Sequence, residues 1–152
     1  MSNRKTFLMV DSGGTRCAIP LPQVIETMRP LPIKRIPDAP AAVLGAAVIR
    51  GRAVPVLNLA ALLSIPGDVP FRRFVTLRTG SGVVALALTD VVGIRQLEAE
   101  QIGSLPPLLS AAEQHAVGQI GTLDRELMLV LEAARVLPAD FLAALGREAN
   151  AC

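Results

Sequence analysis

The chain has 152 residues, 51% of them hydrophobic and 18% charged, and its formal net charge is +2. This composition excludes an intrinsically disordered protein and predicts one domain, or two small subdomains sharing a core, that folds without disulfides or metals. Nucleic-acid binding needs clustered cations and aromatic rings on which bases stack. The basic residues adjoin only in pairs and aromatic residues make up 3% of the chain, so we expect no nucleic-acid partner.

Metal-binding and membrane-spanning patterns are missing from the sequence. The two cysteines, Cys17 and Cys152, and the single histidine, His115, cannot supply the four ligands of a usual zinc site, so we predict no metal and no cofactor. The apolar stretch at residues 7–10 is too short for a signal peptide, and no run approaches the roughly 20 apolar residues of a spanning helix. We therefore expect a soluble cytoplasmic protein with no direct membrane insertion.

The first half of the chain consists of short β-leaning runs separated by turn residues. Gly51 favours a tight hairpin turn, because glycine adopts the positive φ that such turns need. Pro55 predicts an edge strand or a bulge, since proline cannot donate to a strand ladder. Asn58 is the predicted N-cap of a short helix over residues 58–63. The predicted strands are residues 6–10, 16–19, 23–29, 46–49 and 53–57.

The second half repeats this pattern after residues 65–70, which form the best internal boundary. The run 83–88 is almost continuously apolar, so we expect it to be buried on both faces. Apolar residues on one helical face predict a C-terminal helix over residues 138–148. A mainly β fold of small barrels with short helices is therefore predicted. The remaining predicted strands are residues 74–77, 83–88, 91–94, 117–123 and 127–131.

No group of residues in the sequence is typical of an enzyme active site, so we predict a non-catalytic protein. A nucleophilic Cys17 would require a lowered thiol pKa and a neighbouring base, whereas a cysteine within an apolar strand usually packs as a small hydrophobic residue. Two alternatives remain open. One is a small thiol-dependent enzyme that uses Cys17 with His115 and Asp90, and the other is a generic interaction module of another two-component pathway.

Arg50 is the most informative charged residue. It lies between two apolar runs, where a cation must either point to solvent or find a carboxylate. Glu26, in another otherwise apolar run, is the candidate partner. An exposed turn residue is the alternative interpretation of Arg50.

Two segments resemble the CheW family of chemotaxis adaptors: residues 35–45, with Pro-Asp-Ala-Pro followed by Gly, and residues 49–59, with Ile-Arg-Gly-Arg-Ala-Val-Pro. Weaker agreement extends the resemblance over residues 6–137. The resemblance implies one domain over residues 6–137 that consists of two intertwined, SH3-like, five-stranded β-barrel subdomains. Residues 138–152 then form the C-terminal helix and tail.

The resemblance also implies a function. Family members are non-catalytic adaptors that couple the cytoplasmic tips of chemoreceptors, the methyl-accepting chemotaxis proteins, to the regulatory domain of a CheA-type histidine kinase. They work in the cytoplasm and are recruited to membrane-associated receptor arrays. Val24 and Arg50 match family positions of receptor contact, Glu26 matches the acidic partner of that arginine, and Gly45 matches a position tied to kinase coupling.

Overall fold

The structure is a computed structural model that describes residues 4–80, 82–98, 102–104, 117–123 and 126–131. These residues form strands and two short helical segments, a 3-10 turn η1 (Leu21–Gln23) and the helix α1 (Leu59–Leu62). The predicted mainly β fold is therefore confirmed. The strands are β1 (Arg4–Ser12), β2 (Thr15–Pro20), β3 (Val24–Met28), β4 (Val43–Ile49), β5 (Arg52–Asn58), β6 (Arg73–Thr79), β7 (Gly82–Leu88), β8 (Asp90–Glu98), β9 (Ile102–Ser104), β10 (Val117–Leu123) and β11 (Glu126–Leu131).

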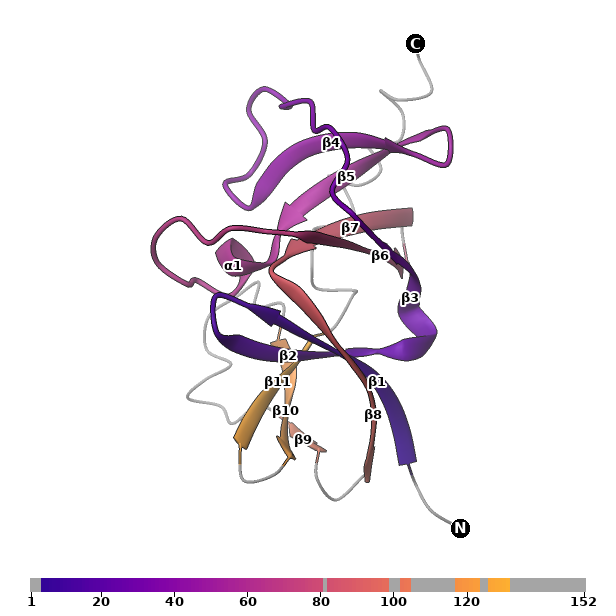
Figure 1. The fold of residues 1–152 in the computed structure, drawn as a ribbon, viewed down its shortest axis with the longest axis vertical. Helices are drawn as coiled ribbons and strands as arrows, with labels where there is room; N and C mark the ends of the chain where they lie inside the picture. Colours follow the sequence, from indigo (N-terminus) through magenta and orange to yellow (C-terminus); the bar gives the residue numbers. More distant parts are fainter. Residues whose placement is uncertain (1–3, 81, 99–101, 105–116, 124–125, 132–152) are drawn as a thin grey trace.

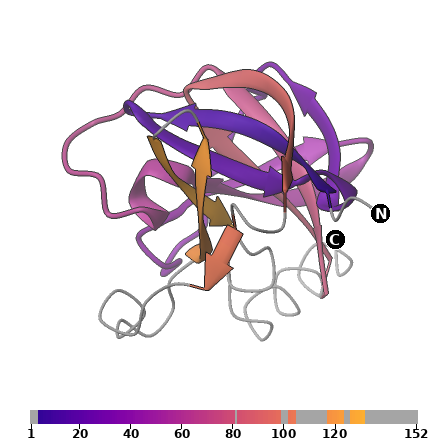
Figure 2. The same ribbon diagram turned by 90° about the horizontal axis from the view of Figure 1, so that it is seen from below.

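The strands make two sheets, one above the other in Figure 1. The six-stranded sheet has the order β8-β1-β2-β11-β10-β9, and the five-stranded sheet has the order β3-β6-β7-β5-β4. Figure 2 shows β9, β10 and β11 beside the β1–β2 hairpin, where β11 pairs in parallel with β2. This arrangement is consistent with the two small barrels that the resemblance implies.

The internal boundary predicted at residues 65–70 is wrong. Both sheets take strands from each side of that stretch: β6 pairs with β3, β7 pairs with β5, and β8 pairs with β1. The Pro- and Gly-rich stretch is therefore a connection within one structure, because strands after it pair with strands before it in both sheets. Residues 138–152, with the predicted C-terminal helix, lie outside the described residues.

Most of the local predictions in the first half are confirmed. Asn58 caps α1, since its Oδ1 accepts a hydrogen bond from the Ala60 N–H at 3.1 Å. Pro55 does not mark an edge strand, because β5 lies between β7 and β4. The pairing of β5 with β7 begins only at Val56, so the missing N–H of Pro55 leaves no ladder bond unmade.

The two sheets share a hydrophobic core, which we call the shared core. Strand β7 separates it from a second cluster within the five-stranded sheet. Successive residues of β7 point alternately into the shared core and into the second cluster: Leu86 packs in the former and Ala85 in the latter. The predicted burial of β7 on both faces is therefore confirmed. The shared core consists of Leu8, Val10, Cys17, Ile19, Leu57, Leu59, Val75, Leu77, Val84, Leu86 and Leu88.

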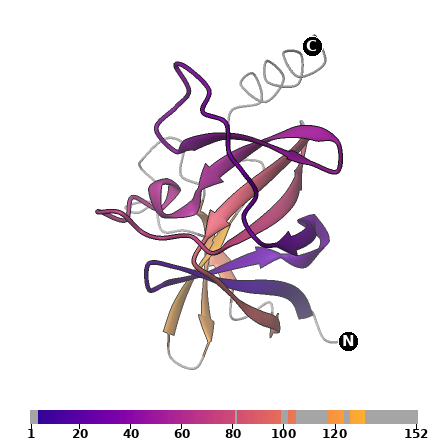
Figure 3. The ribbon, with the colours of Figure 1, turned by 45° about the horizontal axis from the view of Figure 1, so that its top comes forward.

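The connection from β3 to β4 crosses the front of the five-stranded sheet before it enters β4 (Figure 3). We call residues 30–36 of this connection the strap. Lys34 and Ala46 exchange two backbone hydrogen bonds, each 2.8 Å long, and Ile33 packs against the second cluster. The strap is therefore attached to β4, which is the edge strand of its sheet.

No helix among the described residues is long and apolar enough to cross a lipid bilayer.

Candidate functional site

Arg50 and Glu26 form a two-pronged ion pair on the five-stranded sheet, as the sequence predicts. The Arg50 Nε donates to Glu26 Oε1 at 3.1 Å, and Nη2 donates to Oε2 at 2.7 Å. The Arg50 side chain is 79% exposed and that of Glu26 is 26% exposed. The carboxylate is therefore partly covered, while the guanidinium faces solvent and is oriented by its two hydrogen bonds.

The turn between β4 and β5 places Arg50 at the tip of a hairpin. Arg50 and Gly51 have φ angles of 56° and 76°, and the flanking residues Ile49 and Arg52 are paired. Two successive positive φ angles in a two-residue loop indicate a type I′ turn, which normally favours Asn-Gly. The sequence predicts the positive φ of Gly51 but not that of Arg50. Arginine at this position carries backbone strain, which is typical of residues held for function.

A bulge in β3 places Glu26 opposite the hairpin tip. Val24 pairs with Leu77 and Glu26 pairs with Thr76, so Ile25 is the extra residue. The buried Thr76 Oγ1 accepts from the Glu26 N–H at 3.1 Å and donates to the Glu26 carbonyl oxygen at 3.2 Å. Sequence reasoning missed Thr76, although a polar residue within the apolar run 74–77 was the available signal.

Arg50 also changes the ionisation of its partner. Hydrogen bonds from the Arg50 guanidinium, assisted by its positive charge, lower the pKa of Glu26 below its ordinary value, and partial desolvation opposes this only in part. The same hydrogen bonds raise the pKa of Arg50. A guanidinium has five N–H donors, and those of Arg50 that do not point at Glu26 are open to a partner's acceptor oxygens.

Acid is therefore expected to break this pair at an unusually low pH. Because the folded-state pKa of Glu26 is lowered, the stabilisation by the pair is complete above the unfolded pKa and is lost as the pH falls through the folded pKa. A carbon-13 NMR titration of the Glu26 carboxyl should give a midpoint below the ordinary value of 4.5 in the wild type and near it in Arg50→Ala. Equal midpoints in the two proteins would contradict this account.

Val24 lies two residues from Glu26 on β3 and packs, partly buried, against the shared core. Gly45 lies elsewhere, in β4, and is buried beneath the strap. It has a φ of +146°, and a Cβ at this position would overlap the Lys34 carbonyl oxygen and lie 2.7 Å from the carbonyl carbon. The structure thus brings Val24, Glu26 and Arg50 to one region and keeps Gly45 apart. The receptor and kinase roles of these residues stay predictions.

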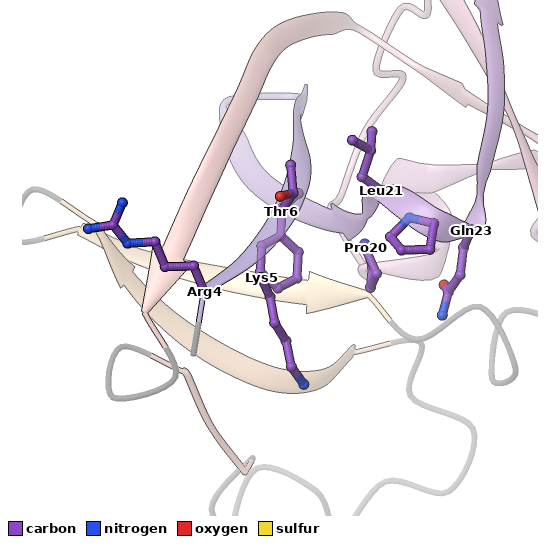
Figure 4. A pocket seen from close by; sticks show the side chains of 8 residues that line it. Arg4, Lys5, Thr6, Pro20, Leu21 and Gln23 are labelled. Carbon is purple, nitrogen blue, oxygen red and sulfur yellow. The ribbon is translucent and has the colours of Figure 1, made fainter. Parts of the chain in front are cut away.

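A cavity of about 740 Å³ adjoins Val24 along the chain (Figure 4). One wall comes from β1 and the other from the segment that ends β2 and forms η1. The Gln23 Oε1 is buried and has no hydrogen-bond partner among the described residues. The lining consists of Arg4, Lys5, Thr6, Phe7, Pro20, Leu21, Pro22 and Gln23.

Cys17 does not have the environment of a nucleophile. It is fully buried in the shared core, and this burial, assisted by the charge of Asp11, raises the pKa of its thiol to about 12. Asp90 pairs with Arg72 at 3.2 Å, and His115 lies outside the described residues. Within the described ranges, no group of three or more His, Cys, Asp or Glu residues could hold a metal ion. The alternative of a thiol-dependent enzyme is not favoured.

The Cys17 thiol is therefore expected to be inert in the folded protein. In a Cys152→Ser background, an aromatic disulfide reagent at pH 8 should label Cys17 only at the rate of unfolding, because the buried thiol is protonated and covered. The same protein in concentrated urea should be labelled completely. Rapid labelling of the native protein would contradict the burial of Cys17.

Comparisons with known proteins agree with this structure. The family model described as the CheW-like domain matches residues 6–141. The chain is 31% identical over 119 residues to protein FrzA of Myxococcus xanthus, which covers 75% of this chain and 72% of that protein. It is 25% identical over 134 residues to the chemotaxis protein CheW of Helicobacter pylori, which covers 85% of this chain and 79% of that protein.

A solved structure has the same fold. The scaffolding protein TtCheW of Thermoanaerobacter tengcongensis superposes with a TM-score of 0.78 and 17% sequence identity, covering 90% of this chain and 92% of that chain. The chain belongs to the CheW-like domain family.

Proposed function

We propose that this protein is a non-catalytic scaffold that couples the cytoplasmic tips of chemoreceptors to the regulatory domain of a CheA-type histidine kinase. Membership of the CheW-like domain family supports a scaffold role in chemotaxis-type signalling. On this proposal the protein works in the cytoplasm and is recruited to membrane-associated receptor arrays. Its mechanism is assembly, with no bond made or broken.

The Glu26–Arg50 pair is the observation that carries the proposal. Arg50 is exposed, oriented by a partly covered carboxylate and held in a strained turn, and these features favour a contact residue over a stabilising one. Glu26 acts as the positioning residue, since it fixes the direction of the guanidinium. The exposed N–H donors of Arg50 suit the acceptor oxygens of a receptor helix.

The cavity, which adjoins Val24 along the chain, supplies a second candidate contact surface. Pro20 and Leu21, which are partly exposed, offer apolar contact to a receptor side chain. An amphipathic helix, which presents apolar and polar side chains on adjacent faces, is the kind of partner that could use an apolar cavity and an exposed cation together. A receptor tip would thus be held through Val24, the cavity and Arg50.

Binding to the receptor fragment should depend on Arg50 and Glu26. We expect Arg50→Ala and Glu26→Ala each to weaken the affinity for the cytoplasmic fragment of a chemoreceptor from the same genome by about tenfold or more, because the first removes the contact and the second its orientation. Isothermal titration calorimetry measures this. The matched control is Arg52→Ala, which removes an exposed cation from the same hairpin and should leave the affinity within about twofold.

The kinase provides the complementary measurement. Affinity for the CheA-type regulatory domain from the same genome should change little in the Arg50 and Glu26 variants. A wild-type protein that binds neither the receptor fragment nor the kinase domain would overturn the proposed function. Equal losses of receptor affinity in Arg52→Ala and in Arg50→Ala would overturn the role of the Glu26–Arg50 pair in receptor binding.

A further inference from the structure

The strap has a free backbone edge. In an antiparallel bridge, the residue that exchanges both hydrogen bonds faces its partner strand, and the backbone groups of its two neighbours face the other way. Lys34 makes both bonds with Ala46, so the N–H and C=O groups of Ile33 and Arg35 point away from β4. Among the described residues, none of these four groups makes a hydrogen bond. The strap therefore offers acceptors and donors to one further extended segment.

The same edge is surrounded by positive charge. Lys34 and Arg35 are exposed on the strap, and Arg29 precedes it. Arg73 lies beside Arg29, because the last paired residues of β3 and β6 are Met28 and Phe74. Within the described ranges, none of these four side chains makes an ion pair. Exposed cations at an edge normally repel unwanted strands, but they also select an acidic one.

We propose that the strap is a docking edge for an extended, carboxylate-bearing segment of a partner protein. The segment forms hydrogen bonds with the backbone of Ile33 and Arg35. Its acidic side chains reach the cations of Lys34 and Arg35 and the neighbouring cations of Arg29 and Arg73. The exposed Leu31 adds an apolar contact at one end.

This inference rests on the proposed function, since it assigns the strap to the kinase domain and leaves the Glu26–Arg50 pair to the receptor. Gly45 then acts as a positioning residue. It allows the strap to lie close against β4, and it presents no side chain of its own. A backbone edge with cationic flanks is also specific, because both the direction of the partner segment and its charge are fixed.

The test uses charge reversal in the full-length protein. We expect Lys34→Glu/Arg35→Glu to weaken binding of the CheA-type regulatory domain by about tenfold or more and to leave receptor-fragment binding within about twofold. Arg78→Glu/Arg95→Glu is the matched control, since it makes the same change in net charge at exposed positions outside the strap. It should change both affinities by less than about twofold. Equal losses of kinase binding in the two double variants would overturn the inference.

A second arm separates this inference from the proposed function. An eight-residue peptide of alternating glutamate and valine is titrated into nitrogen-15-labelled protein, with alternating lysine and valine as its control. The amide resonances of Ile33 and Arg35 should shift with the acidic peptide alone. If no shift occurs, or if vesicles containing anionic lipid bind the strap in place of the peptide, the docking edge is overturned. If the peptide binds but neither protein partner does, the proposed function fails and the acidic docking edge stands.

Discussion

Gly45→Ala is expected to lower the free energy of unfolding by about 2–4 kcal/mol and to release the strap from β4. Two effects add together. The φ of +146° lies in a region that residues with a Cβ rarely adopt, and the new Cβ would overlap the Lys34 carbonyl group. That overlap is with backbone, so no side-chain rotation relieves it. The two hydrogen bonds between Lys34 and Ala46 must therefore lengthen or break.

Gly93→Ala separates these two effects. Gly93 has a φ of +154°, and a Cβ there would meet nothing within 4 Å, so this variant carries the backbone strain without the overlap. Urea unfolding should show a smaller decrease in the free energy of unfolding for Gly93→Ala than for Gly45→Ala. Hydrogen exchange of the Lys34 and Ala46 amides should accelerate only in Gly45→Ala. If the two variants lose the same free energy of unfolding and the Lys34 and Ala46 amides stay protected from exchange, Gly45 is not what allows the strap to lie against β4.

Gly45→Ala also tests the proposed docking of the kinase domain on the strap. If Gly45 supports the strap, Gly45→Ala should reduce binding of the kinase domain although it alters no charge and no surface side chain. Receptor binding through Arg50 should be retained, because the Glu26 carboxylate that orients Arg50 comes from β3 and not from the strap. A loss confined to kinase binding therefore distinguishes displacement of the strap from general unfolding.

The sequence predicted those features that depend on local chemistry. The Glu26–Arg50 pair was a candidate from two charged residues in apolar runs and from the family resemblance, and the structure shows Arg50 to be both exposed and paired. The cap at Asn58 followed from the preference of asparagine for helix starts. Burial of β7 on both faces followed from its continuous apolar run. Each of these inferences needs only a few neighbouring residues or a rule about charge.

The features that the sequence did not reveal depend on which strands meet. The bulge at Ile25 and the contact of Thr76 with Glu26 exist only in the register of β3 against β6. The crowding at Gly45 exists only because the strap crosses β4. The error at residues 65–70 has the same origin, since the parallel pairing of β5 with β7 joins segments on either side of that stretch.

Leu86→Ala is expected to destabilise both sheets together, by about 2–5 kcal/mol. Leu86 is fully buried in β7, where it pairs with Val75 on one side and Leu57 on the other. It packs in the shared core, to which the six-stranded sheet contributes Leu8, Val10, Cys17 and Ile19. A cavity at this position removes contacts from both sheets at once, so neither sheet should unfold alone.

Native-state hydrogen exchange at two amides tests this coupling. Hydrogen exchange of the Val10 amide in β1 and of the Val75 amide in β6 should accelerate by the same factor in Leu86→Ala, while Ile94→Ala, at a side chain that is 60% exposed, should change neither appreciably. Acceleration confined to β6 would mean that the sheets are stable separately. On the proposed function, the receptor surface reaches the six-stranded sheet through the cavity, whereas the strap is attached to the five-stranded sheet. The shared core is then the physical link between these two surfaces, and it holds the bound partners in a fixed relation only as long as the sheets open together.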